Sequence, residues 1–205
     1  MSARTPAPKE LQPASFAFTS KNLDTAKAII ARYPPRREAS AVMPLLDLAQ
    51  RQHDGWLPRA AMDHVAELLQ MAPIRVYEVA TFYTMYNLAP VGRHHIQVCT
   101  TTPCWLRGST DIAAACMQRL GIGFGETTAD GQFTLSEVEC LGACVNAPMI
   151  QVNDDYYEDL TPESTTAVLD ALAKGEQPKT GPQNSRNTSE PEGGRTTLLD
   201  AKEDA

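Results

Sequence analysis

The stretch that decides the fold is His95-Ile-Gln-Val-Cys-Thr-Thr-Thr-Pro-Cys104, in which a short apolar alternation runs directly into two cysteines. The alternation of Ile96 and Val98 with polar neighbours predicts a strand. Apolar residues at helical spacing follow from Trp105 to Leu120. The predicted order is therefore strand, cysteine loop, helix.

A second pair of cysteines occupies the same place after a later strand. Phe133 to Val138 predicts that strand, and Cys140-Leu-Gly-Ala-Cys144 follows it. Adjacent strands that end at the same edge bring their loops together, so we expect Cys99, Cys104, Cys140 and Cys144 to converge. Four thiols meeting in this way predict a site that binds a metal centre.

The rest of this half predicts a small α/β sandwich of the thioredoxin kind. Met149 to Val152 and the pair Tyr156-Tyr157 predict two more strands, with Asp154-Asp155 between them as a hairpin. A last helix is predicted from its N-cap at Thr161 to Gly175. The order βαβ followed by ββα gives a thioredoxin-like domain over residues 91–175.

The sequence before this domain predicts an all-α bundle over residues 19–90, so the chain as a whole belongs to the α+β or α/β class. Residues 1–18 contain three prolines and little apolar periodicity, and we expect them to be loose. Residues 176–205 are rich in Pro, Gly, Ser, Thr and charge, which predicts a disordered or partner-bound tail. Four helices are predicted in the bundle, near Ser20–Tyr33, Val42–Ala49, Pro58–Leu69 and Ile74–Tyr86.

Composition and charge exclude several classes of protein. The net charge is -7 and the basic residues are dispersed, which argues against a nucleic-acid partner. No apolar run approaches the ~18 to 20 residues of a spanning helix, and no signal peptide or presequence pattern is evident. We expect a bacterial cytoplasmic protein, with a mitochondrial matrix location less favoured, and any membrane association would come through partners.

The spacing of the cysteines favours a [2Fe–2S] cluster but leaves alternatives open. Such a cluster needs four thiolates in two pairs, and C-x4-C with C-x3-C loops provide them. Structural zinc also takes four cysteines, although usually in tighter C-x2-C pairs. Disulfides or free thiols are the third alternative. Thioredoxin-type exchange is disfavoured because neither pair has C-x2-C spacing.

The other candidate residues are not predicted to bind a metal or to take part in catalysis. Cys116 lies on the apolar face of a predicted helix and is expected in the core. His94-His95 precede a strand, and neither cysteine loop contains a histidine for a Rieske-like site. Gly121-Ile-Gly-Phe-Gly125 follows a helix, so it predicts a turn rather than a phosphate loop. We therefore propose no catalytic residue and no nucleotide site in this chain.

The aromatic segment Val79-Ala-Thr-Phe-Tyr-Thr-Met-Tyr86 admits two interpretations. It is either the wedge between the helical bundle and the α/β domain or a docking surface. Intramolecular packing is favoured, because apolar helical stripes most often face a core.

Three motifs together resemble a known family. They are Glu78-Val-Ala-Thr-Phe-Tyr83, Cys99-Thr-Thr-Thr-Pro-Cys104-Trp-Leu-Arg-Gly108 and Glu137-Val-Glu-Cys-Leu-Gly-Ala-Cys-Val-Asn-Ala-Pro148. The likeness, from about Phe16 to Gly175, is to the thioredoxin-like [2Fe–2S] family that includes the E subunit of bacterial NADH-quinone oxidoreductase, respiratory complex I. Residues 176–205 match no element of that family.

The resemblance implies a function as well as a fold. It implies one [2Fe–2S] cluster on the four cysteines and one-electron exchange with a flavin in a partner subunit. FMN, NADH and further iron–sulfur clusters are implied on partner subunits of the complex, so this chain would be part of an oxidoreductase (a translocase) without a complete active site. The alternatives are a zinc-stabilised interaction module and the equivalent subunit of an NAD-linked hydrogenase or formate dehydrogenase.

Overall fold

The computed structural model describes residues 5–191, 193–194 and 197. The chain divides into two compact units, one up to Arg93 and one from His94 onward. Within the described residues, no helix is long and apolar enough to cross a membrane.

The first unit is a helical bundle. Its core is built from small and aliphatic side chains that repeat at helical spacing, and Leu45, Leu46 and Val65 are fully buried in it. Its elements are the 3-10 turn η1 (Lys9–Leu11), α1 (Ser20–Ile30), the 3-10 turn η2 (Glu38–Ala41), α2 (Val42–Gln52), α3 (Arg59–Leu68) and α4 (Pro73–Phe82).

Side-chain hydrogen bonds fix where the first helix of the bundle begins. The Thr19 hydroxyl accepts from the backbone N–H of Asn22 at 3.3 Å, which is an N-cap. The Gln52 side-chain oxygen accepts from the Thr19 backbone N–H at 3.0 Å and from the Asn22 amide at 2.8 Å, so the end of α2 is tied to the start of α1. Residues 5–18 belong to the N-terminal stretch that was expected to be loose, but they are held in place. Phe18 is buried, and the Ala7 N–H donates to the Leu88 carbonyl at 2.8 Å.

The aromatic segment after α4 differs from its prediction. The helix ends at Phe82 rather than at Tyr86, because Tyr83 adopts extended backbone angles. Tyr86 is buried and its hydroxyl donates to the Met43 carbonyl at 2.9 Å. Phe82 is 76% exposed and Met85 is 51% exposed, so intramolecular packing accounts for only part of this segment.

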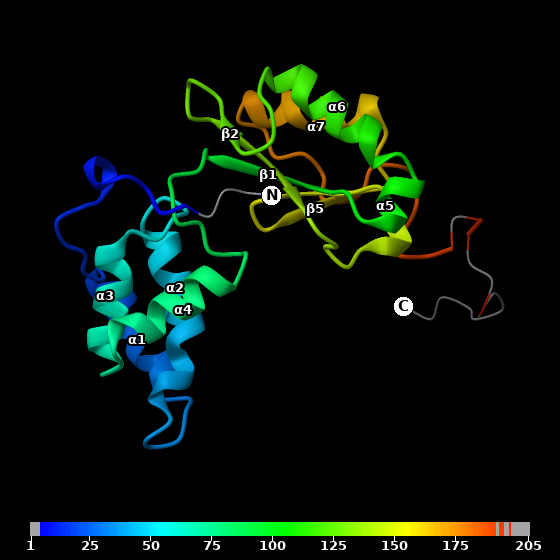
Figure 1. Ribbon diagram of the computed structural model, residues 1–205. Coiled ribbons are helices and arrows are strands. Elements are labelled where there is room, and N and C mark those ends of the chain that lie inside the picture. Colours follow the sequence, from blue (N-terminus) through cyan, green and yellow to red (C-terminus); the bar gives the residue numbers. More distant parts are fainter. Residues whose placement is uncertain (1–4, 192, 195–196, 198–205) are drawn as a thin grey trace. The chain divides into compact units, whose positions relative to one another are not determined.

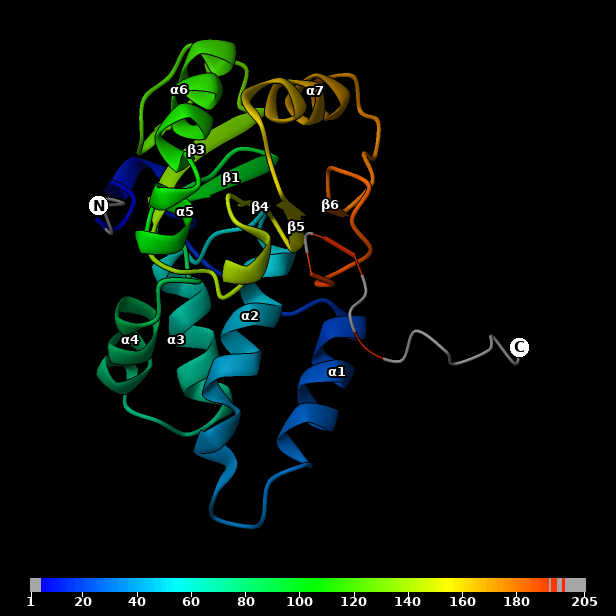
Figure 2. The ribbon, with the colours of Figure 1, turned by 90° about the vertical axis from the view of Figure 1, so that its right-hand side faces the viewer.

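The second unit is built on a six-stranded mixed sheet in the order β2-β3-β1-β4-β5-β6. The central strands β1 and β3 are parallel, and β4 pairs antiparallel with β1 on its other side. The helices α6 and α7 pack together and cover one face of the sheet (Figures 1 and 2). The strands are β1 (His94–Cys99), β2 (Glu126–Thr127), β3 (Phe133–Val138), β4 (Ile150–Val152), β5 (Asp155–Glu158) and β6 (Gly181–Pro182).

The helices of this unit begin and end at recognisable residues. The single helix predicted after the first cysteine loop is two, α5 (Thr102–Leu106) and α6 (Ser109–Leu120), because Gly108 between them has φ +95°, in the left-handed region. The last helix, α7 (Pro162–Ala173), starts at a capping box in which Thr161 and Ser164 bond each other's backbone N–H groups. The predicted fold class, with a helical bundle followed by an α/β domain, is confirmed.

The segment after α7, predicted as part of a disordered or partner-bound tail, is ordered in its first part. Gly181–Pro182 add a short parallel strand to β5, and residues up to Glu190 are held by hydrogen bonds. The composition did not reveal this, because the segment is fixed by its backbone and by one arginine rather than by apolar side chains. The end of the predicted tail, residues 192, 195–196 and 198–205, lies outside the described residues.

Candidate metal centre

The parallel pairing of β1 and β3 brings the two cysteine loops to one edge of the sheet. Cys99 is the last residue of β1 and lies opposite Val138, the last residue of β3. Cys140 follows only two residues later. Since parallel strands run in the same direction, both loops leave the sheet at the same edge. This places the four predicted ligands in one region without any distortion of either strand.

Cys99 and Cys104 form the buried half of the region. They are 2% and 1% exposed and belong to a small apolar cluster with Ala147 and Met149. Thr101 precedes α5 and its hydroxyl lies 3.3 Å from the Cys99 sulfur. The short helix α5 then carries Cys104 back toward Cys99. Apolar walls on this side exclude water from the two thiols.

Cys140 and Cys144 form the exposed half. Their sulfur atoms are 3.5 Å apart and both residues are solvent-exposed. Gly142 between them has φ +86°, which an L side chain rarely adopts, and its N–H donates to the Cys140 sulfur at 3.4 Å. The Tyr156 hydroxyl donates to the Leu141 carbonyl at 2.8 Å and ties this loop to β5.

The electrostatics link the four sulfurs to one another. Burial works to raise the pKa of Cys99, but hydrogen bonds with Thr101, Leu141 and Cys104 outweigh it, so the pKa is lowered overall. Burial, followed by the hydrogen bond with Cys99, raises the pKa of Cys104 to about 12. The hydrogen bond with Cys140 is the first cause that raises the pKa of Cys144. Ionisation of one thiol therefore opposes ionisation of its neighbours, because two thiolates repel each other. A bound cation would offset this repulsion.

This donor set fits a [2Fe–2S] group. Thiolates are the usual ligands of such clusters, and backbone N–H groups stabilise their sulfur charge. Here the Gly142 N–H donates to the Cys140 sulfur at 3.4 Å. Among the described residues, no three His, Cys, Asp or Glu side chains form a group that could hold a metal ion. The four thiols therefore lie as two pairs, and not as one group that already surrounds a single ion.

The other residues considered from the sequence lie elsewhere in the unit. Cys116 is fully buried on α6, and burial raises the pKa of its thiol to about 12. His95 lies on β1 with its Nε2 2.8 Å from the Ser136 hydroxyl. Sequence reasoning missed the supporting role of Tyr156, which it had used only to predict a strand. It also missed Arg186, which lies in the predicted tail and contacts the second cysteine loop.

Comparison with known proteins agrees with the fold. The family model for the thioredoxin-like [2Fe-2S] ferredoxin matches residues 26–173. The chain therefore belongs to the thioredoxin-like [2Fe–2S] ferredoxin family, and the resemblance noted from its motifs is confirmed. Membership of this family supports an iron–sulfur cluster in the chain.

The similar proteins include respiratory subunits. The E subunit of NADH-quinone oxidoreductase from Rickettsia bellii is 62% identical over 158 residues, which is 77% of this chain and 95% of the relative. NADH dehydrogenase [ubiquinone] flavoprotein 2, mitochondrial, of Dictyostelium discoideum is 54% identical over 185 residues, or 90% of this chain and 75% of the relative.

A solved structure shares the fold at lower sequence similarity. A chain of the NAD+-reducing [NiFe]-hydrogenase in the H2-reduced state is 20% identical, with a TM-score of 0.56. The match covers 66% of this chain and 23% of the hydrogenase chain. At that identity the likeness concerns the fold alone.

Proposed function

We propose that the chain is the electron-transfer subunit of an NADH:quinone oxidoreductase of the complex I type, with one [2Fe–2S] cluster on Cys99, Cys104, Cys140 and Cys144. The observation that carries this proposal is the convergence of two thiol pairs at the edge where β1 and β3 end. The names of relatives that are 54% and 62% identical support the choice of complex. The chain would act as part of that enzyme, without a complete active site.

The protein's contribution is to hold the thiolates and to set their surroundings. When bound, the cluster supplies a site that gains and loses one electron while its ligands stay in place. The N–H donor from Gly142 would stabilise the reduced form by offsetting its negative charge. The buried pair, Cys99 and Cys104, would keep water from one side.

The exposed side chains beside the cysteines fit a protein partner. Trp105 is 61% exposed, Leu106 70% and Val145 64%. Trp105 and Leu106 follow Cys104 directly, and Val145 follows Cys144. Large apolar side chains grouped beside a redox site are typical of a surface that a partner covers. We infer that the partner is the subunit that binds FMN and NADH, because electron exchange requires the flavin to lie close to the cluster.

The location follows from the complex. The chain would lie at the inner membrane through its partners, at the cytoplasmic face in a bacterium. Fractionation of cells by centrifugation would test this: the chain should sediment with membranes and be released when the complex is dissociated. A chain found wholly apart from membranes in intact extracts would contradict it.

The cluster is tested by analysis of the anaerobically purified chain. Iron and acid-labile sulfide should be present in equal amounts, about two of each per chain. Reduction by dithionite should produce the electron paramagnetic resonance signal of a reduced [2Fe–2S] centre at low temperature. A colourless chain with stoichiometric zinc and no such signal would overturn the proposal and leave a zinc-stabilised interaction module.

The identity of the complex is tested separately by copurification. Affinity purification of the chain from its own cells should recover a flavoprotein together with membrane-arm subunits of complex I. Recovery of a hydrogenase or formate dehydrogenase subunit instead would assign the same electron-transfer role to a different enzyme.

A further inference from the structure

The segment after α7 folds back along the edge of the sheet. Gly181 and Pro182 pair with Tyr157 and Glu158 of β5. The Gln183 N–H then donates to the Glu158 carbonyl at 2.9 Å. After this pairing the chain runs from β6 toward the loop of Cys140 and Cys144 (Figure 2).

Arg186 joins this segment to the residue after Cys144. Its Nη1 donates to the Val145 carbonyl at 2.8 Å and to Asp159 Oδ1 at 2.9 Å. Its Nε donates to the Glu190 carbonyl at 2.6 Å, which closes the segment into a turn. The ion pair is largely shielded from water, since the Arg186 and Asp159 side chains are 11% and 8% exposed. One guanidinium therefore bonds to three separate parts of the chain.

Asn146 makes a second connection at the same place. Its side-chain amide donates to Asp159 Oδ2 at 2.8 Å and to the Thr188 carbonyl at 2.9 Å. Its carbonyl accepts from the Asp159 N–H at 2.7 Å. Asn146 is 1% exposed and ends the 3-10 turn η3 (Cys144–Asn146). The turn that contains Cys144 is thus bonded to Asp159 and to the C-terminal segment at once.

Besides the bonds of Gly142 to Cys140 and of Tyr156 to Leu141, burial of large apolar side chains does little to hold the exposed part of the loop. Val145 is 64% exposed, so burial of its side chain contributes little to the position of the turn. Cys140 and Cys144 are exposed as well. Hydrogen bonds must therefore supply much of the order on this side. Two of them join the loop to the C-terminal segment: the Arg186 guanidinium donates to the Val145 carbonyl, and the Asn146 side-chain amide donates to the Thr188 carbonyl.

We propose that residues 181–190 form a clamp on the second cysteine loop, with Arg186 as the residue that positions the turn containing Cys144. The clamp fixes the backbone of the turn and through it the direction of the Cys144 thiol. Arginine suits this role because its planar fork donates in several fixed directions from one side chain. The clamp belongs to the chain itself and acts on the loop whatever the four thiols bind.

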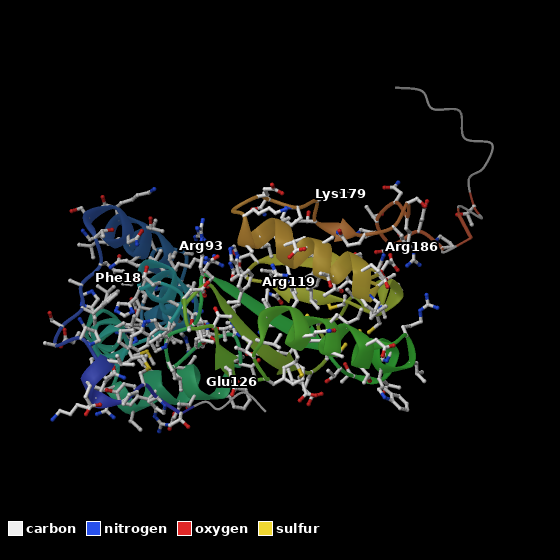
Figure 3. The ribbon with its side chains drawn as sticks, turned by 90° about the horizontal axis from the view of Figure 1, so that it is seen from above. Phe18, Arg93, Arg119, Glu126, Lys179 and Arg186 are labelled. Atoms are coloured by element: carbon white, nitrogen blue, oxygen red, sulfur yellow. The ribbon has the colours of Figure 1, made fainter. Side chains whose placement is uncertain are left out.

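The clamp is tested by amide hydrogen exchange on the purified full chain. In Arg186→Met, the Asn146, Ala147 and Asp159 amides, whose hydrogen bonds lie in or against the loop, should exchange at least roughly tenfold faster. The amides of β1 should exchange at the wild-type rate. The matched control is Arg119→Met, which breaks an ion pair with Asp170 on α6 and α7. Arg119 lies apart from Arg186 (Figure 3), and its replacement should leave the loop amides unchanged.

The outcomes separate a clamp from a mere attachment of the tail. Faster exchange in residues 181–190 with unchanged exchange in the cysteine loop would overturn the proposal. If Arg186→Met raises exchange throughout the unit, Arg186→Lys decides the question, because lysine keeps the charge but has a single nitrogen for three partners. Faster exchange confined to the loop and the segment in Arg186→Lys supports the clamp, and wild-type exchange in the loop overturns it.

Discussion

Cys99 and Val138 lie opposite each other in the parallel pairing of β1 and β3, each as the last residue of its strand. This register places the loop of Cys99 and Cys104 beside the loop of Cys140 and Cys144. A shift of the register by one residue would turn Ile96 and Leu135, which are fully buried, to the opposite faces of the sheet. The burial of the core thus holds the strand ends, and with them the thiols, in place.

The ligand assignment predicts opposite results for two cysteine substitutions. Cys140→Ser should abolish or shift the electron paramagnetic resonance signal and lower the iron content, because serine is a poor substitute for a thiolate ligand. Cys116→Ser should leave the signal nearly unchanged and reduce the free energy of unfolding by about 1–2 kcal/mol, since it buries a hydroxyl among apolar side chains. Loss of the cluster in Cys116→Ser would contradict the assignment.

The exposure of the thiols predicts an order of chemical modification. In the chain freed of iron, iodoacetamide should label Cys140 and Cys144 first, because both are exposed, whereas Cys104 and Cys116 are buried. Loading with iron and sulfide should protect Cys140 and Cys144. Mass spectrometry of peptides after timed alkylation measures this. Equal labelling of Cys140 with and without iron would contradict its assignment as a ligand.

The sequence was sufficient to predict the main elements of the second unit. The run Phe133 to Val138 is the strand β3, and the start of α7 at Thr161 was predicted from Pro162 and Glu163 in its first turn. Elements of this length carry enough periodicity and capping signal to be recognised. The two-residue strands β2 and β6 were missed, because two residues contain no period at all.

The candidate site could be predicted only in part. The four cysteines were found from their spacing and from the order of strands, because both are local features of the sequence. Arg186 and Asn146 were not, since their partners lie 27 and 13 residues away at Asp159 and nothing in the spacing marks them. A hydrogen-bonded clamp has no hydrophobic period, so composition alone assigned it to a tail.

The capping box of α7 predicts a local loss of stability. Thr161→Ala removes the hydroxyl that accepts from the Ser164 N–H at 3.2 Å, and it should reduce the free energy of unfolding by about 1 kcal/mol. Thr166→Ala on the same helix is the matched control. Its hydroxyl bonds only back to the Pro162 carbonyl, and its loss should change stability by about 0.5 kcal/mol or less. Urea unfolding measures both, and equal effects would argue against the cap.

His95 predicts how stability depends on pH. Burial on β1 lowers the pKa of its imidazole to about 4 from an ordinary value of 6.5. The unfolded chain therefore binds more protons than the folded chain between these values, so stability is fully present above pH 6.5 and falls as the pH drops toward 4. The contribution of this group is at most about 3 kcal/mol.

His95→Gln isolates this contribution from that of the carboxylates. Glutamine does not titrate, and its amide can still bond to the Ser136 hydroxyl, which lies 2.8 Å from Nε2 in the native chain. The difference in free energy of unfolding between wild type and His95→Gln should therefore change with pH in the window between about 4 and 6.5 and stay constant above it. Because the carboxylates are the same in both chains, their titration cancels in the difference. A difference that stays constant across the window would show that His95 is protonated as readily in the folded chain as in the unfolded one, and that its side chain reaches water.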